Sequence, residues 1–247
     1  MAETMKTEII KTETIKPSSP TPHLKTFKLC LLDQFQPVVY GPVVYFYPAK
    51  NVTSGKRSKQ LKKSLSEALT IFYAIAVRIN DNITIECDDE GAQFVEAKFY
   101  GLLSTFLEKL ANPKVLQRFL PIAFGSQKAG TWPLLLVQAT FFDCGGLAIG
   151  VCLSHKCADA TTMGMFMKSW AATSKGSAQI VAPVLHAASY FPLIELSSQV
   201  PAMELKKVEC VTKRFLSDKE KIVALKAKTA SDSAKQPTRV EVVTALI

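Results

Sequence analysis

Residues 152–159 bring together side chains that could do chemistry. His155 follows an apolar run directly, and Asp159 lies four positions later. An imidazole with an ordinary pKa of about 6.5 suits general acid–base catalysis, and a carboxylate can hold the loop that carries it, as a helix cap or ion-pair partner. The pattern His-x-x-x-Asp is therefore compatible with a general base at His155, while a structural histidine remains the other interpretation.

Two other kinds of chemistry fit the same segment less well. Cys157 could be a nucleophile with His155 as its base, but a buried structural thiol is the more common role of such a residue. Cys152, His155, Cys157 and Asp159 match no common zinc spacing, so we expect no metal site. The sequence also contains no GxSxG, P-loop, HExxH or Rossmann glycine pattern, which leaves acid–base chemistry at His155 as the leading hypothesis.

The elements around this segment should place it at the end of a sheet. Residues 134–142 and 147–153 are apolar runs that predict two buried strands, joined by a turn over 143–146. The second run leads into Ser154, and a helix with Met163, Phe166 and Trp170 on one face follows, capped by Asp159. Active sites of α/β proteins often lie at such strand ends.

The rest of the chain indicates the α/β class, a mixed sheet with flanking helices. We predict strands over 7–16, 43–47 (buried) and 208–216, an extended segment over 24–32, and a hairpin of strands 83–87 and 93–97 around Asp88–Gly91. Helices are predicted over 61–79 and 99–110, and a further helix is opened by Ser217–Glu220 and ends near Ala230. Loops are expected over 51–58 and 111–130, and Thr238–Glu241 has the spacing of a capping box.

Composition excludes several protein classes. The chain has 247 residues, of which 48% are hydrophobic, so it can bury a core and is not a disordered or collagen-like chain. No apolar run approaches the roughly 18 residues of a membrane helix. The N-terminus has no apolar stretch typical of a secretory signal, and we therefore expect a cytoplasmic protein.

The net charge of +9 and the pI of about 9.2 raise the question of an anionic partner. A solvated surface, a docking site for a phosphorylated cofactor and a nucleic-acid surface are the three interpretations. No nucleic-acid motif accompanies the basic residues, so we expect no nucleic-acid partner. The densest basic stretch consists of Lys50, Lys56, Arg57, Lys59, Lys62 and Lys63.

Several segments together resemble the plant BAHD acyltransferases, and the opening around Pro17–Pro22 resembles their alkaloid branch. Ser154–Ala160 with Lys168–Ala172 is similar to the HxxxD region of the family. The other matching segments are Leu61–Leu69 with Phe72, Tyr73, Arg78 and Ile79; Glu86–Gly91; Phe94–Ala97; Phe191–Pro192; and Pro237–Ile247.

The resemblance implies a function and a fold. Such enzymes move an acyl group, here expected to be acetyl, from acyl-CoA to a hydroxyl or amine of a small molecule such as an alkaloid. His155 would be the general base, and Asp159 would support the catalytic loop. Acyl-CoA would be a co-substrate, with no permanently bound cofactor, no metal and no membrane or nucleic-acid partner. The resemblance assigns no cofactor-binding residue. The fold would be a chloramphenicol-acetyltransferase-like N-terminal domain plus the start of a second domain.

The chain should divide into an N-terminal acyltransferase domain (1–180), a crossover linker (181–206) and the beginning of a second domain (207–247). The last predicted helix is still running at Ile247, and the family's second motif, Asp-Phe-Gly-Trp-Gly, is absent. Ala74 and Val77 replace a family Pro and Gly. We therefore expect the first part of a longer protein, and the alternative function is a truncated, non-catalytic BAHD-like protein that is inactive or binds a partner.

Overall fold

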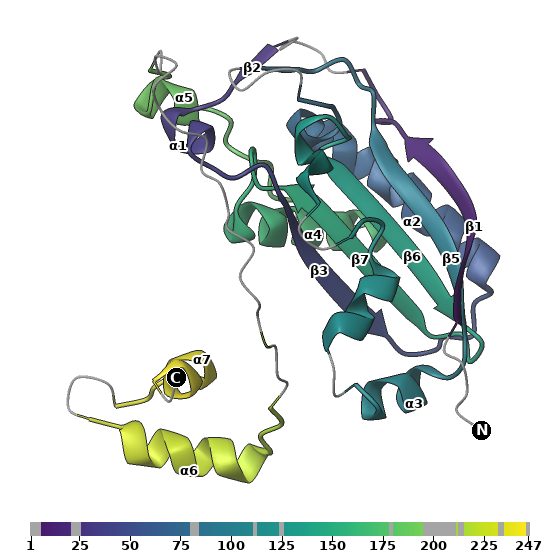
Figure 1. Ribbon diagram of the computed structural model, residues 1–247, viewed down its shortest axis with the longest axis vertical. Coiled ribbons are helices and arrows are strands. Elements are labelled where there is room, and N and C mark those ends of the chain that lie inside the picture. Colours follow the sequence, from purple (N-terminus) through teal and green to yellow (C-terminus); the bar gives the residue numbers. More distant parts are fainter. Residues whose placement is uncertain are drawn as a thin grey trace. The chain divides into compact units, whose positions relative to one another are not determined.

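The computed structural model (Figure 1) describes residues 6–20, 26–79, 84–110, 113–123, 126–177, 180–194, 211, 215–231 and 235–245. The strands are β1 Lys6–Ile15, β2 Thr26–Lys28, β3 Tyr40–Tyr47, β4 Thr84–Glu86, β5 Ala92–Tyr100, β6 Leu135–Phe142 and β7 Leu147–Ser154. The α-helices are α1 Leu31–Gln34, α2 Ser54–Ile71, α3 Leu103–Glu108, α4 Ala160–Ser174, α5 Ala187–Tyr190, α6 Lys219–Thr229 and α7 Arg239–Thr244; 3-10 helices are η1 Tyr73–Ile75, η2 Pro113–Phe119 and η3 Gln127–Gly130.

Within the described residues, five strands form a mixed sheet in the order β1-β5-β6-β7-β3. β5 and β6 run parallel, and the other neighbouring strands run antiparallel. β2 and β4 form a separate two-stranded sheet. The predicted α/β class, a mixed sheet with flanking helices, is therefore confirmed.

Helices cover both faces of this sheet (Figure 1). α2 and α4 pack on one face, where Phe94, Val137 and Phe166 belong to the main core. On the opposite face, α3 and η2 contribute Phe106 and Phe119 to an aromatic cluster. Every residue of β6 and β7 is buried, because both faces of these strands are covered. That explains why their sequences are continuous apolar runs rather than alternating patterns.

One glycine is required where η2 meets the sheet. A Cβ on Gly150 would lie 1.8 Å from the carbonyl oxygen of Phe119, much closer than any real contact. Glycine at this position of β7 therefore lets the end of η2 approach the strand directly.

The predicted hairpin of residues 83–87 and 93–97 is wrong. β4 pairs with β2, whereas β5 lies between β1 and β6. Gly91, at a φ of 94°, donates its N–H to Ala76 O at 2.7 Å. This bond connects the turn to Ala76, the residue directly after η1. The sequence pattern of a hairpin was present, but long-range pairing with β1 and β6 determines where β5 lies.

The predicted limits of the helix 61–79 are also wrong. α2 begins at Ser54, inside the expected loop 51–58, because the Thr53 side chain accepts a hydrogen bond from Lys56 N and caps it. It ends at Ile71, since Phe72 leaves helical geometry at φ −99° and ψ 44°. The apolar spacing continues from 72 to 79 because these residues face the core in a 3-10 turn and an irregular segment.

Three other segments differ from expectation. β3 is an edge strand and only partly buried, which is where Pro42 is tolerated because it cannot donate to a ladder. The extended segment 24–32 contains β2 but gives way to α1 at Leu31. The predicted helix 99–110 is shorter in the structure and is confined to α3, because Phe99 and Tyr100 still belong to β5. The expected loop 111–130 contains the two 3-10 helices η2 and η3.

Contacts divide the chain into residues 1–110 with 114–209, and residues 111–113 with 210–247. In the second unit, Asp218 rather than Ser217 caps α6, because its carboxylate accepts from Lys221 N at 2.8 Å. The capping box predicted at Thr238 and Glu241 opens α7. The predicted strand 208–216 lies largely outside the described residues, and the domain limits at 180 and 207 stay predictions.

Candidate active site

His155 is the first residue after β7. Its N–H donates to Val39 O at 2.8 Å, which ties the start of the loop to the segment that leads into β3. The side chain is half-buried. Its Nδ1 is buried and has no hydrogen-bond partner in the described part of the chain. Buried polar atoms are nearly always paired in native proteins, so an orphaned imidazole nitrogen at a strand end is an unusual feature that points to function.

Ser154 and Cys157 fix the backbone of this loop. Ser154 is fully buried, and its N–H donates to Leu134 O at 2.8 Å. The Cys157 thiol donates to Ser154 O at 3.5 Å, and burial raises the pKa of this thiol to about 12. The thiolate is the nucleophilic form, so this raised pKa favours a structural role for Cys157 over a nucleophilic one. No cluster of potential metal ligands occurs among the described residues.

Asp159 caps α4, as its position in the sequence predicted. Its Oδ1 accepts from Thr162 N at 2.7 Å. This backbone hydrogen bond lowers the pKa of the carboxyl group below its usual value, so the group is charged at neutral pH. Because Nδ1 of His155 is unpartnered, Asp159 does not bond to that nitrogen. Its side-chain contact is with the first turn of α4.

Lys156 is a residue of this loop that sequence reasoning missed. It is only 5% exposed, and its Nζ donates to Gln34 O at 3.0 Å and to Asp33 O at 3.3 Å. Burial lowers the pKa of this ammonium group, and the charge of Asp33 opposes that effect. No local signal could have found these contacts, because a lysine beside a histidine has the pattern of a surface residue and its acceptors lie more than 100 positions away.

The acceptors of Lys156 belong to α1, whose N-terminal end is held by two hydrogen bonds. The Asp33 carboxylate accepts from Cys30 N at 2.8 Å and closes a capping box at the helix start. Leu31 N donates to Phe191 O at 3.0 Å, so that α1 and α5 lie side by side in Figure 1. The short helix α1 is therefore a fixed support and not a free loop.

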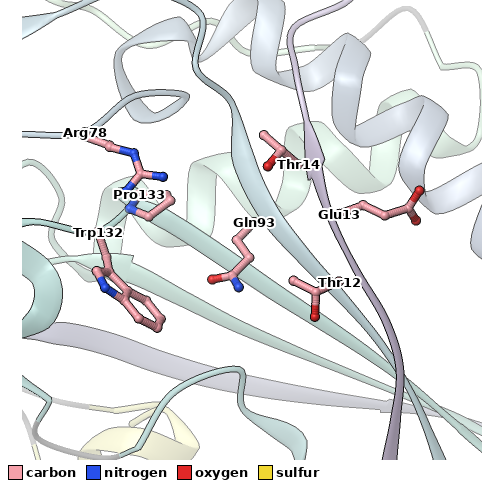
Figure 2. A pocket seen from close by; sticks show the side chains of 7 residues that line it. All are labelled: Thr12, Glu13, Thr14, Arg78, Gln93, Trp132 and Pro133. Carbon is pink, nitrogen blue, oxygen red and sulfur yellow. The ribbon is translucent and has the colours of Figure 1, made fainter.

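A polar groove of about 310 Å³ opens at the same end of the sheet, on the face away from α2 and α4 (Figure 2). Gln93 of the lining lies on β5, whereas Pro133 directly precedes Leu134, whose carbonyl oxygen accepts from Ser154 N at 2.8 Å, so one wall of the groove adjoins the end of β7 that leads to His155. His155 itself is not among the residues that line it. Its lining consists of Thr12, Glu13, Thr14, Arg78, Gln93, Trp132 and Pro133.

The basic stretch of residues 50–63 is partly used in the fold. Arg57 is buried and donates to Gly145 O at 2.5 Å. Lys62 pairs with Glu13 and with Glu96, which joins α2 to β1 and β5. These two cations are structural, which weakens the interpretation of the whole stretch as one anion-docking surface. No described helix is both long enough and apolar enough to cross a membrane.

Comparison with known proteins gives one consistent relationship. The model of the Transferase family matches residues 5–247. Stemmadenine O-acetyltransferase of Catharanthus roseus is 42% identical over 97% of this chain and 59% of its own length. Vinorine synthase of Rauvolfia serpentina is 41% identical over 97% of this chain and 59% of its own length. The chain thus spans somewhat more than half the length of the curated relatives it matches.

Solved structures agree with this relationship. The crystal structure of vinorine synthase matches with a TM-score of 0.83 and 38% identity, over 97% of this chain and 58% of that one. TRI101 of F. graminearum, crystallised with coenzyme A and deoxynivalenol, matches with a TM-score of 0.58 and 14% identity, over 90% of this chain and 59% of that one, and so shares the fold alone. The predicted chloramphenicol-acetyltransferase-like α/β fold is confirmed. On the family model and these relatives, the chain belongs to the Transferase family, that is, to the BAHD acyltransferases.

Proposed function

We propose that the full-length protein transfers an acyl group, acetyl in the simplest case, from acyl-CoA to a hydroxyl group of a specialised metabolite such as an alkaloid. The observation that carries the proposal is the position of His155, half-buried at the end of β7, with a buried Nδ1 that has no hydrogen-bond partner among the described residues. Support for the substrate class comes from the relatives, which include stemmadenine O-acetyltransferase and a 13-O-acetyltransferase of an N-methylcanadine in Papaver somniferum.

His155 is the general base in this proposal. Because Nδ1 is buried, Nε2 is the nitrogen left to meet the acceptor. Nε2 takes the proton of the acceptor hydroxyl as its oxygen attacks the thioester carbonyl. The tetrahedral intermediate then collapses to the ester and expels the CoA thiolate, which recovers the proton from the imidazolium. An acyl-enzyme is not needed, in keeping with the protonated state of the Cys157 thiol.

Asp159 acts indirectly. Its carboxylate caps α4 and fixes the end of the loop that carries the imidazole. A general base must be held within hydrogen-bond reach of the proton that it abstracts, so a firm loop end contributes to the rate without contact with substrate. The residues that bind coenzyme A are not assigned, and acyl-CoA enters this proposal as a co-substrate.

The test is His155→Ala in the full-length protein, with release of the CoA thiol as the signal. The substrates are acetyl-CoA with stemmadenine and with a panel of other alkaloid and limonoid alcohols. We expect a loss of turnover of about 10²- to 10⁴-fold, the usual contribution of a general base. His186→Ala is the matched control, because that exposed histidine makes no side-chain cap contact at α5.

The possible results separate the hypotheses. Unchanged turnover in His155→Ala would remove the general base from the mechanism. A wild-type protein that folds but releases no CoA thiol with any acceptor would favour the alternative, a non-catalytic protein that is inactive or binds a partner.

A further inference from the structure

We infer that Lys156 is a positioning residue for His155: its buried ammonium group fastens the histidine loop to helix α1. The inference deepens the proposed function and rests on the role of His155 as the base. It concerns how the imidazole is kept in place, and Lys156 itself need not touch a substrate.

The environment of Lys156 is built for one ammonium group. The residue is 5% exposed, and Nζ donates to the carbonyl oxygens of Asp33 and Gln34 at 3.3 and 3.0 Å. These carbonyls lie at the C-terminal end of α1, where Asp33 O also accepts from Gln36 N at 3.1 Å. A buried ammonium group loses far more by leaving its acceptors than an exposed one does, so this contact is stable and directional.

The segment that follows α1 also forms a hydrogen bond with the neighbouring residue, His155. The His155 N–H donates to Val39 O at 2.8 Å, five residues beyond Gln34. The chain from α1 to the start of β3 therefore holds the loop at two consecutive residues, once through the backbone of His155 and once through the side chain of Lys156. With both contacts in place, the backbone that carries the imidazole has little freedom to rotate.

The support behind Lys156 is also fixed. α1 donates hydrogen bonds to the chain after α5, because Leu31 N donates to Phe191 O at 3.0 Å and Gln34 Nε2 donates to Ile194 O at 3.5 Å. Lys156 thus links the histidine loop to an element that is anchored independently of the loop. Without the ammonium group, the loop would keep its own turn, the backbone bonds of Ser154 to Leu134 and of His155 to Val39, and the Asp159 cap, but it would lose its link to α1.

The first test compares Lys156→Met with Lys156→Arg in the full-length protein. Methionine keeps the apolar stem and removes the donors, whereas arginine keeps donors that can reach two carbonyls. We expect kcat to fall by about 10- to 100-fold in Lys156→Met, with KM within about twofold, and to recover substantially in Lys156→Arg. Lys63→Met is the control, since Lys63 is an exposed residue of α2.

A second readout does not depend on turnover. Diethyl pyrocarbonate acylates an accessible unprotonated imidazole, and peptide mass analysis resolves each histidine. We expect His155 to react several times faster in Lys156→Met than in the wild-type protein, while exposed His186 reacts at an unchanged rate. This result can be obtained even if the proposed acyl transfer fails, so failure of the two proposals can be told apart.

Combining substitutions tests whether Lys156 acts through His155. In a His155→Ala background, Lys156→Met should leave the residual rate unchanged, because residues that act as a unit are not additive. A folded Lys156→Met protein with normal kcat and normal His155 labelling would overturn the inference, as would an equal loss of rate with and without His155. If Lys156→Met does not fold, Lys156→Gln replaces it in every arm, and the same outcomes decide.

Discussion

At the scale of single residues, Asp159 combines a charge with a structural contact. Its carboxylate accepts the Thr162 N–H at 2.7 Å and caps α4. We predict that Asp159→Ala lowers the free energy of unfolding by about 1 kcal/mol, the usual loss when an N-cap side chain is removed. Urea denaturation followed by circular dichroism measures this difference.

The pH dependence of that effect has a defined sign. Because the pKa of Asp159 is lowered in the folded state, its contribution is complete above the ordinary carboxyl pKa of about 4 and is lost as the pH falls through the folded-state pKa. Asp159→Asn keeps a capping oxygen and no titratable group. It should therefore stay close to the wild type at neutral pH and lose less stability on acidification. An Asn variant as unstable as the Ala variant would argue against the cap.

Residue-level inference from the sequence worked where the cause was local. The cap at Asp159 follows from residue preference directly before an apolar helix face, and the place of His155 follows from the apolar run that it terminates. Lys156 could not be found in this way. Its burial depends on carbonyls of residues 33 and 34, which only the folded chain brings to it.

At the scale of elements, two glycines make a matched pair. A Cβ on Gly150 of β7 would lie 1.8 Å from Phe119 O, whereas one on Gly164 of α4 would meet no neighbouring atom within 4 Å. We predict that Gly150→Ala costs about 3 kcal/mol or more, because η2 must move off the strand. Gly164→Ala should stabilise by up to about 1 kcal/mol, since alanine favours a helix interior.

Urea midpoints of both variants test the packing of η2 on β7. An unchanged midpoint in Gly150→Ala would mean that Phe119 does not approach the strand as described. Gly164→Ala is the control for a general effect of alanine on stability, because it should shift the urea midpoint in the opposite direction.

The sequence predicted strands correctly where both faces of the strand are buried. It predicted the wrong strand partner where the pairing is between segments distant in the sequence. β6 and β7 are covered on both faces, and their apolar runs predicted both strands and the turn between them. β5 contains Gln93, Glu96 and Lys98 and is not a continuous apolar run, and its partners β1 and β6 are distant in the sequence, so the adjacent β4 was wrongly paired with it. Local patterns identify a strand, whereas its neighbours depend on the whole core.

At the scale of the whole molecule, the two units differ in how much they bury. The sheet and its helices enclose nearly all of the described core, including Phe94, Phe119 and Phe166. In the second unit, α6 has no buried residue, and Val223 on it is 57% exposed. The stability of a helix in a protein comes mainly from packing of an apolar face, so α6 should be far less stable than the helices that cover the sheet.

Hydrogen exchange of the 247-residue chain tests this difference. We predict that the amides of α6 exchange at least about a thousandfold faster than those of β6 and β7, because they open locally while the central strands require global unfolding. α4 is the control: it is also a capped helix, but Met163, Phe166 and Trp170 are buried on the sheet. If α6 is protected as well as α4, a packed apolar face must stabilise it, since 11 residues with an Asp218 cap are too short to hold such a helix alone.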